Sequence, residues 1–147
     1  MKAVYATGTN YDDPLSVLEV GTMPEPETKP FWSTIRVKSA SVNHHDVWSL
    51  QGVGLADEQT PMILGTDAAG VLQEDIPVRK GLKAGSEVVL YTFVGTDGAG
   101  VMPGERRSIL SERYAGTMAE YTQVPSANVF AKPANLNLDE AAALGTL

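Results

Sequence analysis

The side chains best suited to proton chemistry lie in the range 41–70. The chain has two histidines, His44 and His45, and they are adjacent in this stretch, so their side chains point to different sides of the local backbone. An imidazole can give or take a proton near neutral pH, which makes either one a candidate acid or base. Asp46 can orient an imidazole or nearby backbone amides. Its position three residues after Asn43 also fits a helix capping box, with Asn43 as the cap.

A second set of side chains is suited to holding an organic substrate. Trp48 follows the histidines, and Tyr91 ends a short apolar run. Flat aromatic side chains commonly line small-molecule pockets, although Tyr91 fits a core position equally well. Thr66 and Asp67 bring a hydroxyl and a carboxylate to the same part of the chain. For Asp67 we expect a structural role, with an arginine or a backbone amide as its partner.

The composition excludes several other kinds of chemistry. There is no cysteine, which removes disulfides, thiolate catalysis and the commonest ligand of structural zinc. The 18 acidic and 11 basic side chains give a net charge of -7, so nucleic acid is not an expected partner. The sequence contains no run of about 18 apolar residues and no signal-peptide pattern. We therefore expect a cytoplasmic protein that does not contact a membrane.

Short apolar runs between turn residues predict a mainly β domain. The runs are rich in β-branched or aromatic residues and bounded by Gly, Pro, Asn or Ser, as in an antiparallel sandwich or a partly open barrel. We expect strands at 3–6, 17–20, 35–38, 71–72, 87–91, 118–124 and 128–131. A chain of 147 residues has room for one such domain.

Two short helices are predicted between the strands and at the end of the chain. The first follows Asn43 and is ended by Gly52, because glycine readily adopts the positive φ of a helix end. The second begins at Asn137, has Glu140 at the capping-box position and continues in alanines. Between the helices, residues 95–116 form a polar, glycine-rich excursion. We expect its arginines to be solvated, and a role at a subunit interface or over the pocket mouth is the alternative.

The order of these motifs resembles the medium-chain dehydrogenase/reductase superfamily, which contains zinc alcohol dehydrogenases and zinc-free quinone reductases. The similar segments are 43–46, 61–70, 83–89, 116–121 and 138–142. The resemblance implies a GroES-like catalytic domain over residues 1–147. Residues 137–147 then correspond to the start of the helix that leads to a Rossmann domain carrying NAD(P). That domain is expected outside this chain, which has no correctly spaced G-x-G-x-x-G motif.

The resemblance also bears on zinc. Asn43 and Thr66 match two positions that hold the catalytic metal in the zinc enzymes, and neither an amide nor a hydroxyl competes well for zinc. Asn43 is also the residue that the zinc-free quinone reductases have at this position. Asp67 matches the glutamate beside the metal. We therefore expect no bound metal, and a zinc alcohol dehydrogenase with atypical ligands such as His44 and Asp67 is the alternative.

The remaining site residues receive roles from the same resemblance. His44 matches a position that contacts the cofactor pyrophosphate, and His45 matches the position that relays a proton from the substrate oxygen. Trp48 stands where quinone reductases have a tyrosine near the nicotinamide. Tyr91 stands where alcohol dehydrogenases have an aromatic pocket wall, and Thr66 is expected to line the same substrate pocket.

Together these features predict the substrate-binding catalytic domain of a zinc-independent, NAD(P)-dependent oxidoreductase of the quinone or enone reductase type. His45, Asn43 and Asp46 are the expected catalytic residues, and His44, Asn43 and Trp48 are the expected cofactor contacts. Hydride would reach an electrophilic carbon of a small-molecule substrate, and His45 or water would supply the proton. Alone, the chain is expected to be inactive, because the nicotinamide must be held against the substrate. A stand-alone GroES-like binding module is the alternative, and a homodimer is a possible assembly.

Overall fold

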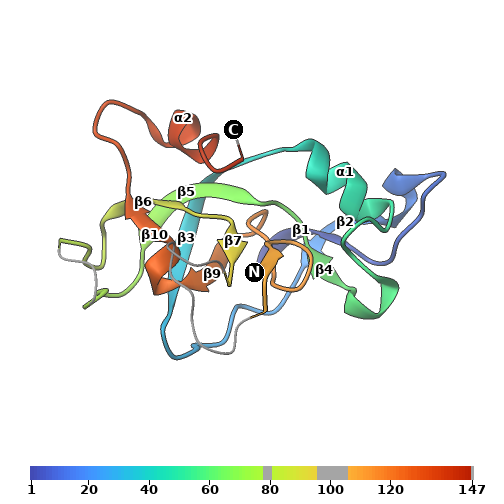
Figure 1. The fold of residues 1–147 in the computed structure, drawn as a ribbon, viewed down its shortest axis with the longest axis horizontal. Coiled ribbons are helices and arrows are strands. Elements are labelled where there is room, and N and C mark those ends of the chain that lie inside the picture. Colours follow the sequence, from blue (N-terminus) through green and yellow to red (C-terminus); the bar gives the residue numbers. More distant parts are fainter. Residues whose placement is uncertain (78–80, 96–105, 147) are drawn as a thin grey trace.

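Three antiparallel sheets and two short α-helices make up the fold (Figure 1). A computed structural model describes residues 1–77, 81–95 and 106–146. The strands are β1 (Lys2–Ala6), β2 (Leu18–Thr22), β3 (Trp32–Ser41), β4 (Met62–Ile63), β5 (Asp67–Leu72), β6 (Glu87–Leu90), β7 (Phe93–Val94), β8 (Ser108–Ile109), β9 (Tyr121–Pro125) and β10 (Val129–Ala131). The helices are α1 (His44–Leu50) and α2 (Leu138–Ala142), with 3-10 turns η1 (Pro14–Val17), η2 (Asp57–Gln59) and η3 (Ser126–Asn128). The mainly β class predicted from the sequence is confirmed.

The five-stranded sheet, in the order β10-β6-β5-β3-β9, carries the largest core cluster, with Ile35 of β3 fully buried in it. β3 pairs with β5 on one side and with β9 on the other. Gly70 of β5 lies so close to β3 that a Cβ there would be 2.3 Å from the carbonyl oxygen of Arg36. This tight pairing fixes the strand ends, where Ser41 and Asp67 are register partners.

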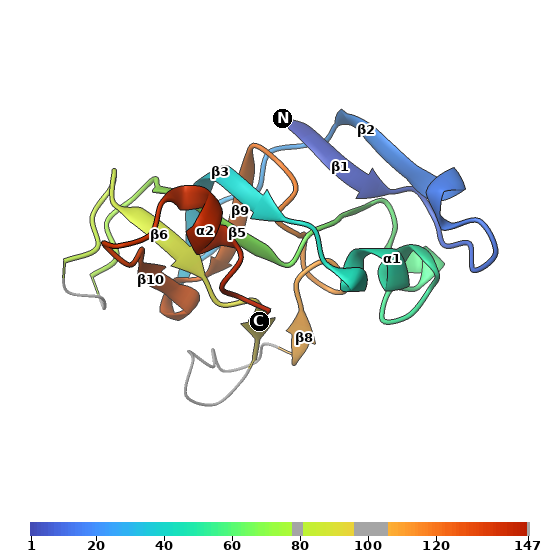
Figure 2. The same ribbon diagram turned by 90° about the horizontal axis from the view of Figure 1, so that it is seen from above.

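The three-stranded sheet, in the order β2-β1-β4, lies beside the first sheet, and α1 lies near the end of β1 (Figure 2). The two sheets are joined where the backbone N–H of Val4 donates to the carbonyl oxygen of Met118 at 2.8 Å. Leu50 of α1 packs with Leu55 and Leu64 in a second core cluster. The helix that carries both histidines is therefore anchored through its buried face.

Local signals at both ends of α1 explain why it forms. The Asp46 carboxylate accepts the backbone N–H of Asn43 at 2.8 Å, which is the capping contact predicted from the sequence. At the other end Gly52 has a φ of 86°, and its N–H donates to the carbonyl oxygen of Ser49 at 3.0 Å. Gly52 therefore ends the helix as predicted, in a conformation that other residues rarely adopt.

The predicted capping box of α2 is also confirmed. The Asn137 side chain accepts the backbone N–H groups of Asp139 and Glu140, each at 2.9 Å, and the Glu140 carboxylate accepts the N–H of Asn137 at 2.9 Å. Two buried alanines of α2 pack against β5. In Figure 1 both α-helices lie on the same side of the sheets. Within the described ranges, no helix is long and apolar enough to cross a membrane.

Two strand predictions need correction. The strand expected at 118–124 begins only at Tyr121, because the preceding residues cross to β1, where Ala119 bridges Ala3. The strand expected at 17–20 begins at Leu18, because η1 occupies the residues before it. In the excursion at 95–116, β8 pairs with β7, which lies just before the excursion. Residues 96–105 lie outside the described residues, as does Leu147.

Candidate functional site

Most of the predicted site residues gather at one end of the five-stranded sheet. Ser41 ends β3 opposite Asp67, which starts β5. β6 pairs with β5 as far as Val89 and Ala69, and Tyr91 follows directly after β6. α1 begins three residues after the end of β3. Asn43 and the two histidines therefore leave the sheet at this same end.

A buried carboxylate, Asp67, organises the first group of site residues. Its Oδ2 accepts hydrogen bonds from the Asn43 amide at 2.8 Å, from the Ser41 hydroxyl at 3.0 Å and from the Thr146 hydroxyl. The Asn43 amide nitrogen also donates to the Thr66 hydroxyl at 3.0 Å. Asp67 and Thr66 are both almost fully buried. The two positions that the resemblance assigned to zinc ligands are thus bonded directly to each other.

The partners of Asp67 differ from the sequence prediction. An arginine or a backbone amide was expected, whereas Oδ2 is held by two hydroxyls and one side-chain amide. The other oxygen, Oδ1, is buried with no hydrogen-bond partner among the described residues. Gly145 covers it so closely that a Cβ there would lie 2.2 Å from Oδ1. Since Thr146 is 79 residues away in the sequence, local reasoning could not find this contact.

Asp46 connects α1 to the turn between β4 and β5. Its Oδ2 accepts the N–H of Asn43, and its Oδ1 accepts the N–H of Gly65 at 3.0 Å. The side chain is 5% exposed. Burial raises the pKa of the Asp46 carboxyl above its ordinary value, and the hydrogen bonds from the two backbone N–H groups only partly offset that rise. The sequence predicted the first contact, while the anchor to Gly65 is new.

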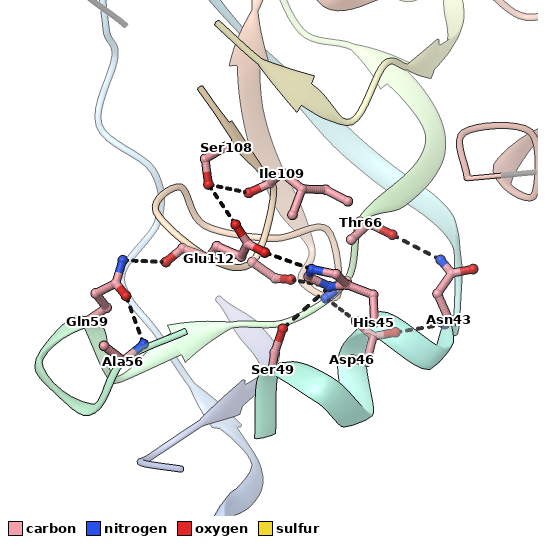
Figure 3. Close-up of polar contacts among 12 residues, drawn as sticks. Asn43, His45, Asp46, Ser49, Ala56, Gln59, Thr66, Ser108, Ile109 and Glu112 are labelled. Atoms are coloured by element: carbon pink, nitrogen blue, oxygen red, sulfur yellow. Dashed lines mark hydrogen bonds and ion pairs between the residues drawn. The ribbon is translucent and has the colours of Figure 1, made fainter. Parts of the chain in front are cut away.

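His45 lies in a polar group that the sequence did not predict (Figure 3). Its Nε2 is 3.1 Å from Oε1 of Glu112, in the segment after β8. Its Nδ1 is 3.4 Å from the hydroxyls of both Ser49 and Ser111. The charged run around Glu112 looked like a solvated surface, and its neighbour Arg113 is indeed exposed. No local signal marks Glu112, because it meets His45 only through a fold that brings positions 67 residues apart together.

The order serine, histidine, glutamate in this group also occurs in acyl-transfer enzymes, but the serines here are inaccessible. Ser49 and Ser111 are both 0% exposed, so no substrate carbonyl can reach either hydroxyl. A nucleophile must contact the atom that it attacks. The arrangement is therefore suited to holding and moving a proton on His45.

His44 and Trp48 lie apart from these two groups, on the exposed face of α1. Their rings make an edge-to-face contact with centroids 5.0 Å apart. Trp48 is 47% exposed, although large aromatic side chains are usually well buried. Tyr91 is half-buried and contacts the Phe93 ring at 5.9 Å. The structure thus separates the predicted site residues into a buried polar part and an exposed aromatic part.

Around Asp67, the side-chain groups that could bind a metal ion are carboxylate, hydroxyl and amide groups. The chain has no cysteine. Across residues 1–77, 81–95 and 106–146, no three histidine or carboxylate side chains are grouped as ligands for one metal ion. His44 contacts Trp48, whereas Asp67 is buried under Gly145. The proposed atypical ligands His44 and Asp67 therefore have no contact in common.

The chain is similar to several alcohol dehydrogenases and acyl-thioester reductases. Residues 29–134 match the alcohol dehydrogenase GroES-like domain. An NAD-dependent alcohol dehydrogenase of known structure is 36% identical, with a TM-score of 0.81, over 99% of this chain and 43% of that one. A thermostable alcohol dehydrogenase from Pyrobaculum aerophilum, with cobalt and zinc bound, is 29% identical, with a TM-score of 0.78, over 98% of this chain and 44% of that one.

Curated relatives include the crotonyl-CoA reductase of Streptomyces avermitilis, which is 28% identical over 160 aligned residues. The alignment covers 93% of this chain and 36% of the reductase, so this chain spans about a third of that relative. The family match and the shared fold both include the strands and the helix that build the polar site. The chain belongs to the alcohol dehydrogenase GroES-like domain family of the medium-chain dehydrogenase/reductase superfamily.

Proposed function

We propose that this chain is the substrate-binding catalytic domain of a zinc-independent, NAD(P)-dependent reductase that acts on quinones or enones. The observation that carries the proposal is the direct hydrogen bond between Asn43 and Thr66, at 3.0 Å. By the resemblance, these residues match the positions that hold zinc in the zinc enzymes of the family. Here they bond to each other and, through Asn43, to Asp67.

The chemistry of these side chains supports zinc independence. The Asn43 amide nitrogen donates to Thr66 and Asp67, which leaves only the neutral amide oxygen as a ligand atom, and such an oxygen is a weak ligand for zinc compared with thiolate or imidazole. The Thr66 hydroxyl is a weak ligand for zinc compared with thiolate or imidazole. In the proposed site, Asn43 instead holds the polar end of the pocket in one arrangement. Its role is to position the cofactor or the substrate oxygen.

The exposed aromatic part of the site fits a nicotinamide cofactor. His44 and Trp48 present an imidazole and a flat ring side by side on the accessible face of α1, where a phosphate and an aromatic ring could be bound. When bound, NAD(P)H supplies the hydride for the electrophilic carbon of the substrate. In this proposal, His44 contacts the pyrophosphate and Trp48 lies against the nicotinamide end.

His45 or water provides the proton that completes the reduction. The His45 side chain is 16% exposed, and an imidazole can both accept and donate a proton. Tyr91 forms an aromatic wall at the same end of the sheet, and Thr66 supports the pocket through Asn43. The crotonyl-CoA reductase relatives favour conjugated acyl thioesters as a second substrate class, because such compounds also have an electrophilic carbon in a double bond conjugated to a carbonyl group.

The test is reductase activity of the protein expressed from its complete gene. NADH and NADPH consumption is measured with a quinone, an enone, an enoyl thioester and an aldehyde. We expect turnover of at least one conjugated substrate. We also expect the His45→Gln and Asn43→Ala variants to lose about a hundredfold or more in kcat, in line with the usual contribution of a positioned proton donor.

The control is Glu27→Gln, an exposed position outside the site, which should keep full activity. Full activity of both site variants would remove the roles assigned to His45 and Asn43. The 147-residue chain alone is assayed in parallel and is expected to be inactive, because positioning a nicotinamide needs a nucleotide-binding domain. If the complete gene product binds ligands but turns over no conjugated substrate with either cofactor, the binding-module alternative takes its place.

A further inference from the structure

We propose that Glu112 is a positioning residue that holds the imidazole of His45 in one orientation, as the Nε2–H tautomer. The inference rests on the proposed function, in which His45 or water supplies the proton. An ionised carboxylate can only accept hydrogen bonds, so the contact of 3.1 Å places the ring proton on Nε2. Nδ1 then keeps its lone pair, and the hydroxyls of Ser49 and Ser111 donate toward it.

The surrounding side chains hold Glu112 in this place. Its second oxygen, Oε2, accepts the Ser108 hydroxyl at 3.1 Å, and its carbonyl oxygen accepts the Gln59 side-chain amide at 3.1 Å. Gly54 makes room for the carboxylate, since a Cβ there would lie 2.2 Å from Oε1. Glu112 is therefore built into the site through both its backbone and its carboxylate (Figure 3).

The backbone next to Glu112 is strained. Ser111 has a φ of 68°, a conformation that few residues other than glycine adopt. Such strain costs on the order of 1–3 kcal/mol and persists only where the surroundings impose it. In this segment the strain accompanies the close approach of Glu112 to α1. Asp46, the carboxylate adjacent to His45, is committed to backbone N–H groups.

The two sides of the His45 imidazole differ in their exposure to solvent. The side chains of His45 and Glu112 are 16% and 24% exposed, whereas Ser49 and Ser111 are fully buried. A proton can therefore be replaced from solvent at the side where Glu112 lies. The contacts from the buried serines to Nδ1 favour the ring orientation in which Nε2 is directed toward the carboxylate.

Ring nitrogen chemical shifts of the 15N-labelled chain test the inference. The chain has two histidines, so His44 is a control within the same sample. At a pH where the imidazoles are neutral, we expect His45 to show one dominant tautomer, Nε2–H. Glu112→Leu should reduce the share of Nε2–H, and Glu112→Gln should restore it because an amide oxygen can also accept. His44 should show no change in either variant.

Three outcomes would overturn the inference: a wild-type His45 that is Nδ1–H, a tautomer that does not respond to Glu112→Leu, or a Glu112→Gln variant that behaves like Glu112→Leu. If Glu112→Leu does not fold, the tautomer of His45 in the wild-type chain still tests the inference. These results do not depend on turnover, so they separate a failure here from a failure of the reductase proposal. If turnover is found, Glu112→Leu should lower kcat at least about tenfold and leave KM nearly unchanged, as expected for a residue that acts through the proton donor.

Discussion

Asp46 makes the stability of the fold depend on pH. Because the folded chain holds this carboxyl at a raised pKa, it binds the proton more tightly than the unfolded chain does. The contribution of Asp46 to the free energy of unfolding is therefore largest below the ordinary pKa of 3.8. That contribution decreases as the pH rises through the raised pKa of the folded state.

The Asp46→Asn variant tests the direction of this pH dependence. Asparagine can accept only through Oδ1, so either Asn43 or Gly65 loses an acceptor for its N–H, at a cost of about 1–3 kcal/mol that does not depend on pH. Urea unfolding of both proteins at several pH values gives the difference in the free energy of unfolding, wild type minus variant. We expect it to become smaller from about pH 4 to about pH 7. Asp12→Asn, at an exposed carboxylate, is the matched control, and a difference that grows with pH would contradict the assignment.

At the scale of elements, the capping box of α2 provides a direct test of a feature visible in the sequence. Asn137→Ala removes the acceptor of two backbone N–H groups and should lower the free energy of unfolding by about 1 kcal/mol. Urea unfolding measures the loss, and amide hydrogen exchange should locate it in α2. Asn135→Ala, at an exposed position just before the cap, should cost less than about 0.5 kcal/mol. Equal costs for the two variants would rule out the capping contribution.

The elements that the sequence predicted well are those whose signals are local. Asn137 and Glu140 are three residues apart, and Gly52 ends α1 through its own backbone. The strand at 118–124 was misplaced because the hydrophobic pattern does not reveal that Ala119 crosses to β1. A bend between two sheets depends on both sheets, so a window of a few residues cannot show it.

The same limit applies to the site at the scale of the whole molecule. Asn43, His45 and Thr66 were named from the sequence because they lie in recognisable motifs. Glu112 and Thr146 were missed, since each meets its partner across more than 60 residues of chain. Local patterns thus predicted which side chains belong to the site, and the fold was needed to pair them.

Metal content is a property of the whole protein, and it tests the proposal that no zinc is used. We expect elemental analysis of the purified chain to find well under one zinc per molecule, and EDTA to leave the Tm unchanged. A metal held in the native state would stabilise it and would be lost with its contribution to Tm. One tightly bound zinc per chain, removable with a drop in Tm, would overturn zinc independence.

The hydrogen-bond partners of Asp67 also determine when this part of the site can be completed during synthesis. Its partners Ser41 and Asn43 leave the ribosome early, whereas Thr146 is made 79 residues after Asp67. Contacts between such distant positions form slowly, because a long loop must close first. In a nascent chain the hydrogen bonds of Asp67 are therefore incomplete until Thr146 has been made, and until then this side chain remains accessible to water.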